Sequence, residues 1–385
     1  MLYFDNQAIA RPSEAVLRKM VPYLREKWGN PTRYHQMGQE LLPDIQEAYQ
    51  SLYKLVGASS KNPFIFTSSG AEGVSQVILS AYFDITRKSG KNHFVTANTD
   101  EAPSILAMSR LQEAGCLFQM IPTNTQGQVT VQALTELLSP RTALVSLSWA
   151  NGLTGVIQPV EEIAQLCRER GILFHVDATH VLGKGEYTLE GSGADVLTFN
   201  GEQLHAPQGT GGLFLREGIS LSPLICGGEE QGGMRGGSWN VPGLIGLAQA
   251  AEEALSFRDH LCMETGRLRN ALEERLCEAI PEVNILFQNE QRLPHITALA
   301  FPGITSEALL YVLNRKGLYA HLGGGNFQKM VHLLKACGVE ERRALSAVSF
   351  ALSRETTEEE IDRAVRLITA TAIEMRKLSE HIINI

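Results

Sequence analysis

Short apolar runs alternate with amphipathic helical stretches through the first two thirds of this chain. The runs predict six strands, at residues 64–67, 94–96, 143–147, 172–176, 196–199 and 212–215. Between two of them, residues 160–170 carry apolar side chains at helical spacing and stop before Gly171, which suits the position after a helix. Repetition of strand, helix and strand predicts a mainly parallel sheet with both faces covered.

The sequence changes character after Val241. An Ala- and Glu-rich helix is expected to about Arg258, and the segments that follow predict a helix at 263–280, a strand at 295–301 and a closing helix from Thr357. A chain of 385 residues also exceeds one ordinary hydrophobic core. We therefore expect a large α/β domain at 13–255, with a small α+β domain formed by 1–12 and 256–385.

Composition and charge exclude several classes of function. The net charge is −8 with no run of Lys or Arg, which argues against nucleic acid or an anionic membrane as a partner. No apolar stretch approaches the roughly 20 residues that span a bilayer. The first residues have neither a basic region nor a long apolar stretch, so we expect a cytoplasmic protein. The six cysteines form no CxxC pair, so no metal site is predicted.

Several glycine-rich and polar segments occur in a characteristic order along the chain. Their positions are 3–6, 29–38, 66–72, 175–180, 197–212 and 227–238. In this order they resemble the motifs of the NifS-like cysteine desulfurases, which are pyridoxal-phosphate (PLP) enzymes of the class V aminotransferase group. The resemblance covers nearly the whole chain. It implies a PLP-transferase-like large domain, PLP as the cofactor and a homodimer.

Residue 203 departs from that family pattern. The segment 197–212 resembles the family's lysine loop, and Pro207, Gly209 and Gly211 keep the alignment in place. The lysine that the family uses to hold PLP then falls on Gln203. A PLP enzyme needs an amine there because the cofactor is bound as a Schiff base. Glutamine has no such amine.

The remaining cofactor positions are mixed. The resemblance assigns cofactor binding to Asp177 (pyridine nitrogen), His180 (ring oxygen) and Asn151. At four further positions the family residues are replaced, by Ala71 and Asn200 (phosphate), Glu202 (phosphate) and Glu101 (ring stacking). A carboxylate about 4 Å from a phosphate is repelled by on the order of 1 kcal/mol per unit charge even in water. These changes predict a pocket unfavourable to the phosphate of PLP.

The substrate positions are replaced as well. Ser349 falls where the family has the arginine that binds the substrate carboxylate, and residues 318–327 hold no cysteine to act as the thiolate nucleophile. We therefore expect a catalytically inactive paralogue with a binding or regulatory role, in which PLP is absent or not covalently bound. A sulfur-transfer partner or an active paralogue is the candidate partner that the resemblance implies.

Two alternatives stay open at this point. The first is an active PLP-dependent transferase that uses another amine, for which Lys184, Lys329 and Lys335 are the candidates. The second is a new ligand or cation site in the altered cleft. Its acidic and imidazole side chains would come from Glu101, Asp177, His180, Glu202 and His205.

Overall fold

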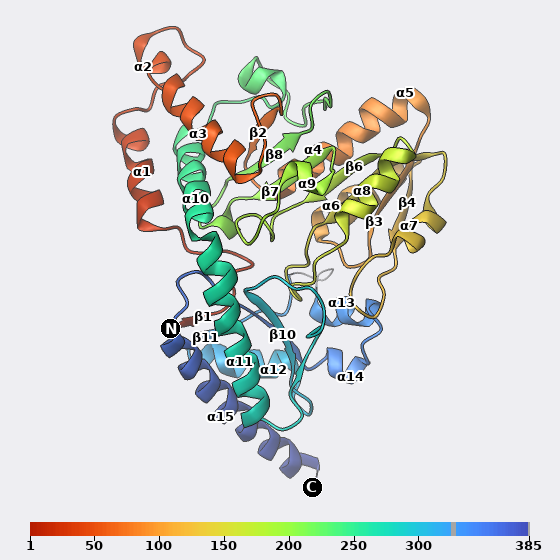
Figure 1. Ribbon diagram of the computed structural model, residues 1–385, viewed down its shortest axis with the longest axis vertical. Helices are drawn as coiled ribbons and strands as arrows, with labels where there is room; N and C mark the ends of the chain where they lie inside the picture. Colours follow the sequence, from red (N-terminus) through yellow and green to blue (C-terminus); the bar gives the residue numbers. More distant parts are fainter. Residues whose placement is uncertain (325–328, 384–385) are drawn as a thin grey trace.

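A seven-stranded sheet forms the centre of the larger part of the protein (Figure 1). The structure is a computed structural model that describes residues 1–324 and 329–383. The strand order is β2-β8-β7-β6-β5-β3-β4, and only β8 runs against the others. The mainly parallel sheet predicted from the sequence is confirmed. The strands are β2 (Phe64–Thr67), β3 (His93–Ala97), β4 (Leu117–Ile121), β5 (Thr142–Ser148), β6 (Leu173–Asp177), β7 (Val196–Asn200) and β8 (Gly211–Leu215).

Both faces of this sheet are covered by helices, as expected for strands that are apolar on both sides. Neighbouring residues alternate between the faces, so Val95 belongs to one core cluster and Phe94 to the other. The first cluster receives side chains from α1 (Glu14–Arg25), α3 (Leu42–Leu55), α7 (Val131–Leu137), α8 (Val160–Glu169) and α10 (Val241–His260). The second receives them from α4 (Gly70–Ser80) and α6 (Ala102–Arg110). Short helices complete this part: α2 (Gln36–Gln39), α5 (Arg87–Ser89) and α9 (Leu189–Ser192).

A glutamine side chain covers part of the β2 edge of the sheet. Gln231 Nε2 donates to the carbonyl oxygen of Phe66 (2.9 Å), and Gln231 Oε1 accepts from the Phe66 backbone N–H (2.6 Å). The amide therefore satisfies both outward-facing backbone groups of Phe66, as a neighbouring strand would.

Two small sheets lie below the large one in Figure 1. β9 (Asn284–Ile285), β10 (Ile296–Ala300) and β12 (Ala347–Ala351) are antiparallel, and β1 (Leu2–Tyr3) pairs in parallel with β11 (Leu318–Tyr319). A separate core cluster here includes side chains from β1 as well as from three helices. The helices of this part are α11 (Gly266–Ala279), α12 (Ser306–Arg315), α13 (Met330–Ala336), α14 (Glu341–Ala344) and α15 (Glu358–Ile383).

The helix that begins after Asn240 continues across the expected domain boundary. α10 runs through residue 255 to His260, and a π-helical turn at Leu261–Thr265 joins it to α11. The sequence predicted two separate helices, and the continuous path is a correction. The division into 13–255 and 1–12 with 256–385 stays a prediction. Among the residues that the structure describes, no helix is both long and apolar enough to cross a membrane.

Candidate functional site

A cavity of about 300 Å³ lies where the carboxyl ends of the parallel strands meet the N-terminal segment. Its wall is formed by residues 98–101 after β3, 151–153 after β5, His180 after β6 and Gln203 after β7, together with residues 7–8. The small-sheet part adds His321, Gly323, Gly324 and residues 332–333. Open α/β sheets bind ligands at this edge. Among the described residues, no Lys or Arg lines the cavity. Residues 325–327 of the expected nucleophile loop lie outside the described residues.

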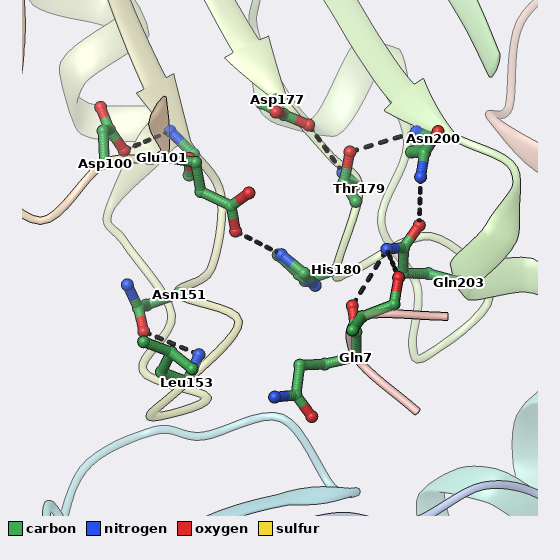
Figure 2. A network of polar contacts seen from close by, with 12 residues as sticks. Gln7, Asp100, Glu101, Asn151, Leu153, Asp177, Thr179, His180, Asn200 and Gln203 are labelled. Carbon is green, nitrogen blue, oxygen red and sulfur yellow. Dashed lines mark hydrogen bonds and ion pairs between the residues drawn. The ribbon is translucent and has the colours of Figure 1, made fainter. Parts of the chain in front are cut away.

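Gln203 is buried and fully hydrogen-bonded. Its Nε2 donates to the carbonyl oxygens of Gln7 (2.9 Å) and Ala8 (2.8 Å), and its Oε1 accepts from Asn200 Nδ2 (2.9 Å) (Figure 2). The side chain therefore ties the N-terminal segment to the end of β7. These bonds use both N–H groups of the amide and its oxygen.

The expected phosphate position is occupied by the protein's own groups. The first backbone N–H of α4, at Gly70, donates to Asn200 Oδ1 (3.1 Å). Asn200 Nδ2 also donates to the Glu202 carboxylate (3.3 Å). Free N–H groups at a helix start are what normally bind phosphate. Here one of these groups is already bonded and a carboxylate lies beside it, so the residues present do not fit the phosphate of PLP. Ala71, at the next helical position, is exposed.

Glu101 and His180 form an ion pair in the cavity wall. Glu101 Oε1 lies 2.6 Å from His180 Nε2, and the His180 side chain is 7% exposed (Figure 2). Burial alone would lower the pKa of His180. The charge and hydrogen bond of Glu101 outweigh burial, so the pKa of His180 is raised. The Glu101 carboxylate thus holds the imidazole of His180 in a fixed orientation.

Gly152 lies against the ring of His180. A Cβ at residue 152 would approach His180 Nε2 to 2.5 Å, which is closer than van der Waals contact allows. Any side chain there would displace the ring from Glu101. The lack of a side chain at Gly152 is therefore a condition for the pair.

Asp177 lies behind the cavity wall. It is partly buried at the end of β6, and its carboxylate accepts from the Thr179 N–H (2.9 Å). Burial, followed by the charge of Glu101, raises the pKa of Asp177 to about 6. The carboxylate assigned to the pyridine nitrogen is present, but it does not line the cavity.

Asn151 and Ser349 serve the local structure. Asn151 Oδ1 accepts from the N–H groups of Leu153 (2.9 Å) and Thr154 (3.0 Å), and Asn151 Nδ2 donates to the Thr99 carbonyl (3.1 Å). Ser349 is fully buried in β12, where its hydroxyl donates to the Leu153 carbonyl (2.7 Å). The amide of Asn151 is therefore engaged by its own turn and by Thr99, and the Ser349 hydroxyl supports the same turn at Leu153.

The five acidic and imidazole residues proposed as a new site do not converge. Only Glu101 and His180 line the cavity. His205 Nδ1 donates instead to the Arg11 carbonyl (2.7 Å), away from the cleft. Within residues 1–324 and 329–383, no group of three or more His, Cys, Asp or Glu side chains is arranged to hold a metal ion. A cation site in the altered cleft is therefore not supported by the described residues.

The alternative amines also lie outside the cavity. Lys184 Nζ is buried and donates to the Gln203 carbonyl oxygen (3.0 Å), and it lines a separate space of about 10 Å³. Burial and the charge of Arg354 lower the pKa of Lys184 to about 8. Lys329 pairs with Glu307 and Lys335 with Glu341 at the surface. None of the three lysines lines the cleft.

Gln7 was not predicted from the sequence to belong to the site. Its side chain is 4% exposed and lines the cavity, and neither of its amide atoms has a hydrogen-bond partner in the described part of the chain. The N-terminal segment 3–6 was recognised as a family motif, but nothing in its pattern indicates that residue 7 turns into the cleft. His321 and His332, from the small-sheet part, were also not predicted to line it.

A Glu101→Gln variant is expected to lower the pKa values of His180 and Asp177, because both are raised by the Glu101 charge. A histidine whose pKa is raised on folding stabilises the fold below its unfolded value of 6.5, and this stabilisation is lost as pH rises through the folded pKa. Above pH 6.5 the unfolding free energy should therefore fall less steeply in the variant. NMR titration of the His180 ring measures the shift. An unchanged His180 pKa would contradict the pairing.

Comparison with known proteins agrees with this fold and the order of its motifs. The family described as "Aminotransferase class-V" matches residues 2–364. The cysteine desulfurase NifS of Azotobacter vinelandii is 34% identical over 99% of this chain and 94% of its own length. A cysteine desulfurase of Gluconacetobacter diazotrophicus is 36% identical over 98% of this chain and 95% of its own. A solved structure titled "NIFS-LIKE PROTEIN" has a TM-score of 0.89 at 31% identity, covering 96% of this chain and 98% of that one.

The fold and the family match define the class: the chain belongs to the class V aminotransferases, with the α/β fold of PLP-dependent enzymes. Within that class it belongs to the NifS-like cysteine desulfurase family. PLP is the cofactor expected from the family.

Proposed function

We propose that this member of the NifS-like family does not carry out PLP-dependent desulfuration and acts by binding, as a catalytically inactive paralogue. The observation that carries the proposal is the side chain at residue 203. A primary amide does not form a Schiff base with an aldehyde, and Gln203 is committed to three hydrogen bonds within the protein. No lysine on the cavity wall replaces it in the described part of the chain.

The charge of the cleft supports the same proposal. Phosphate and carboxylate groups are bound by cationic side chains and free backbone N–H groups. The described wall contains no Lys or Arg, and the start of α4 is bonded to Asn200 beside Glu202. A ligand with an anionic phosphate or carboxylate therefore gains little binding free energy in this cleft.

The proposal includes the remaining expectations for the chain. These are a cytoplasmic homodimer with domains at 13–255 and at 1–12 with 256–385, and a sulfur-transfer partner or an active paralogue as its binding partner. The family resemblance supports the dimer and the partner. The separate core cluster around the small sheets supports the domain division.

Incubation of the purified protein with PLP tests the proposal. We expect no visible aldimine absorbance, no coenzyme mass retained after borohydride reduction, and no sulfide released from cysteine above background. The cysteine desulfurase NifS of Azotobacter vinelandii serves as the positive control. Coenzyme found covalently attached to any residue, or sulfide release that depends on PLP, would overturn the proposal.

A further inference from the structure

The cavity contains a buried amide for which the described protein supplies no partner. The Gln7 side chain is 4% exposed, and both its Nε2 and its Oε1 are buried without a hydrogen bond among the described residues. Figure 2 shows this side chain extending away from Gln203, while the Gln7 backbone carbonyl accepts from Gln203. A buried amide without hydrogen bonds costs free energy, so Gln7 favours a molecule that brings both an acceptor and a donor.

A second unpartnered polar atom lies in the same wall. His180 Nδ1 is buried and makes no hydrogen bond to the described residues. The ring orientation is set from its other nitrogen, which bonds Glu101 at 2.6 Å, and by the close approach of Gly152. Nδ1 is therefore held in place before any ligand arrives, and such preorganisation favours binding.

The rest of the wall limits the charge and size of the ligand. The Glu101 carboxylate is paired with His180, and no described Lys or Arg lies on the wall, so an anion finds no free Lys or Arg counter-charge there. Leu153 and Leu333 supply apolar surface, and Gly323 and Gly324 add no side chains. A volume of about 300 Å³ lies at the small end of ligand sites, with room for about ten groups of the size of water.

We propose that this cavity binds a small uncharged molecule with a carboxamide or cyclic amide edge. The ligand carbonyl accepts from Gln7 Nε2, its N–H donates to Gln7 Oε1, and its apolar body contacts Leu153 and Leu333. The inference rests on the proposed function, because a covalently held coenzyme would occupy the same cleft.

A series of benzene derivatives of one shape tests the assignment by calorimetric titration of the full chain. Benzamide offers the matching donor and acceptor, acetophenone offers an acceptor only, benzoate is an anion and benzamidine a cation. We expect benzamide to bind at least about tenfold more tightly than each of the other three, since each lacks one hydrogen bond or carries a charge. Tighter binding of benzamidine would mean a cationic ligand and would overturn the proposal, as would no binding of any probe.

The Gln7→Met variant is the matched control, because methionine keeps the length and removes both polar atoms. Since Gln7 makes no side-chain hydrogen bond within the described protein, we expect this variant to fold with an unchanged or higher Tm and to bind benzamide at least about tenfold more weakly. Leu333→Trp should weaken binding from the opposite wall. Equal affinity for benzamide in the Gln7→Met variant and the unaltered protein would overturn the proposal. A covalent coenzyme adduct would instead refute the proposed function, so the two failures are distinguishable.

Discussion

An Arg292→Met variant is expected to have an unfolding free energy about 3–5 kcal/mol below that of the unaltered protein. Arg292 Nη1 lies 2.8 Å from Glu273 Oε1, and both side chains are 4% exposed. Removing the guanidinium leaves the Glu273 carboxylate buried without its main counter-charge, which is the costly way to break an ion pair. Arg269 Nε, 4.0 Å from the same carboxylate, keeps part of the compensation and favours the lower end of this range. Urea denaturation measures the loss.

Two further variants distinguish the stability cost of an unpaired buried charge from the cost of lost side-chain contacts. The double variant Glu273→Leu/Arg292→Met should recover much of the stability, since the buried carboxylate is gone and Arg269 keeps its hydrogen bonds to Asn270 and the Leu293 carbonyl. Lys88→Met makes the same kind of exchange in the exposed Lys88–Asp84 pair (3.3 Å) and should cost less than about 1 kcal/mol. If Arg292→Met cost no more than Lys88→Met, the interpretation of the buried pair would be wrong.

The pair also supports the cleft. Arg292 forms an isolated bridge with Val156, and its neighbours Gln291 and Leu293 hydrogen-bond Ile157 and Gly155. These contacts hold the segment that follows Asn151 and Gly152. We therefore expect the destabilised variant to lose order first in this wall of the cavity.

A Gln203→Lys variant is expected to release no more sulfide from cysteine than the unaltered protein, and to be less stable by about 1–3 kcal/mol. Lysine has no acceptor, so the half-buried Asn200 amide loses the bond that Gln203 Oε1 provides. The restored amine would still lie near Glu202, and Ser349 would still stand where the family resemblance expects the substrate arginine. Sulfide release and the absorbance spectrum with PLP measure the outcome.

Gln203→Met is the control for this experiment. It keeps the side-chain length but removes every side-chain hydrogen bond of residue 203, so it reports the stability effect without an amine. Sulfide release by Gln203→Lys, with none by Gln203→Met, would show that the rest of the pocket is competent. That result would refute the argument that the other altered positions of the pocket also prevent catalysis.

The sequence predicted the buried part of the fold well because buried strands appear in it as uninterrupted runs of apolar residues. The predicted strand at 64–67 coincides with β2, and the helix predicted at 160–170 is α8. β4 (Leu117–Ile121) was missed because the polar Gln119 interrupts its apolar run, which this edge strand tolerates because it is only partly buried. The π-helical turn at Leu261–Thr265 was missed because ordinary helical residues form it.

The sequence predicted which residues form the site better than it predicted the contacts between them. Motif order placed Glu101, His180 and Gln203 near one cleft, and all three line it. The bond between Glu101 and His180 was not predicted, because it joins residues 79 positions apart, on separate strand ends. His205 was placed in the cleft wrongly: its backbone has a positive φ of 65°, which directs the ring to Arg11.

The hydrogen bonds of Gln231 affect how copies of this protein can associate through the sheet edge. An uncovered strand at the rim of a sheet invites another chain to extend it, which leads to fibres and precipitates. Gln231 hydrogen-bonds both polar backbone groups of Phe66. These two groups of the edge strand are therefore not available to an incoming strand. A single side chain thus keeps the backbone of Phe66 from pairing with a strand of another copy.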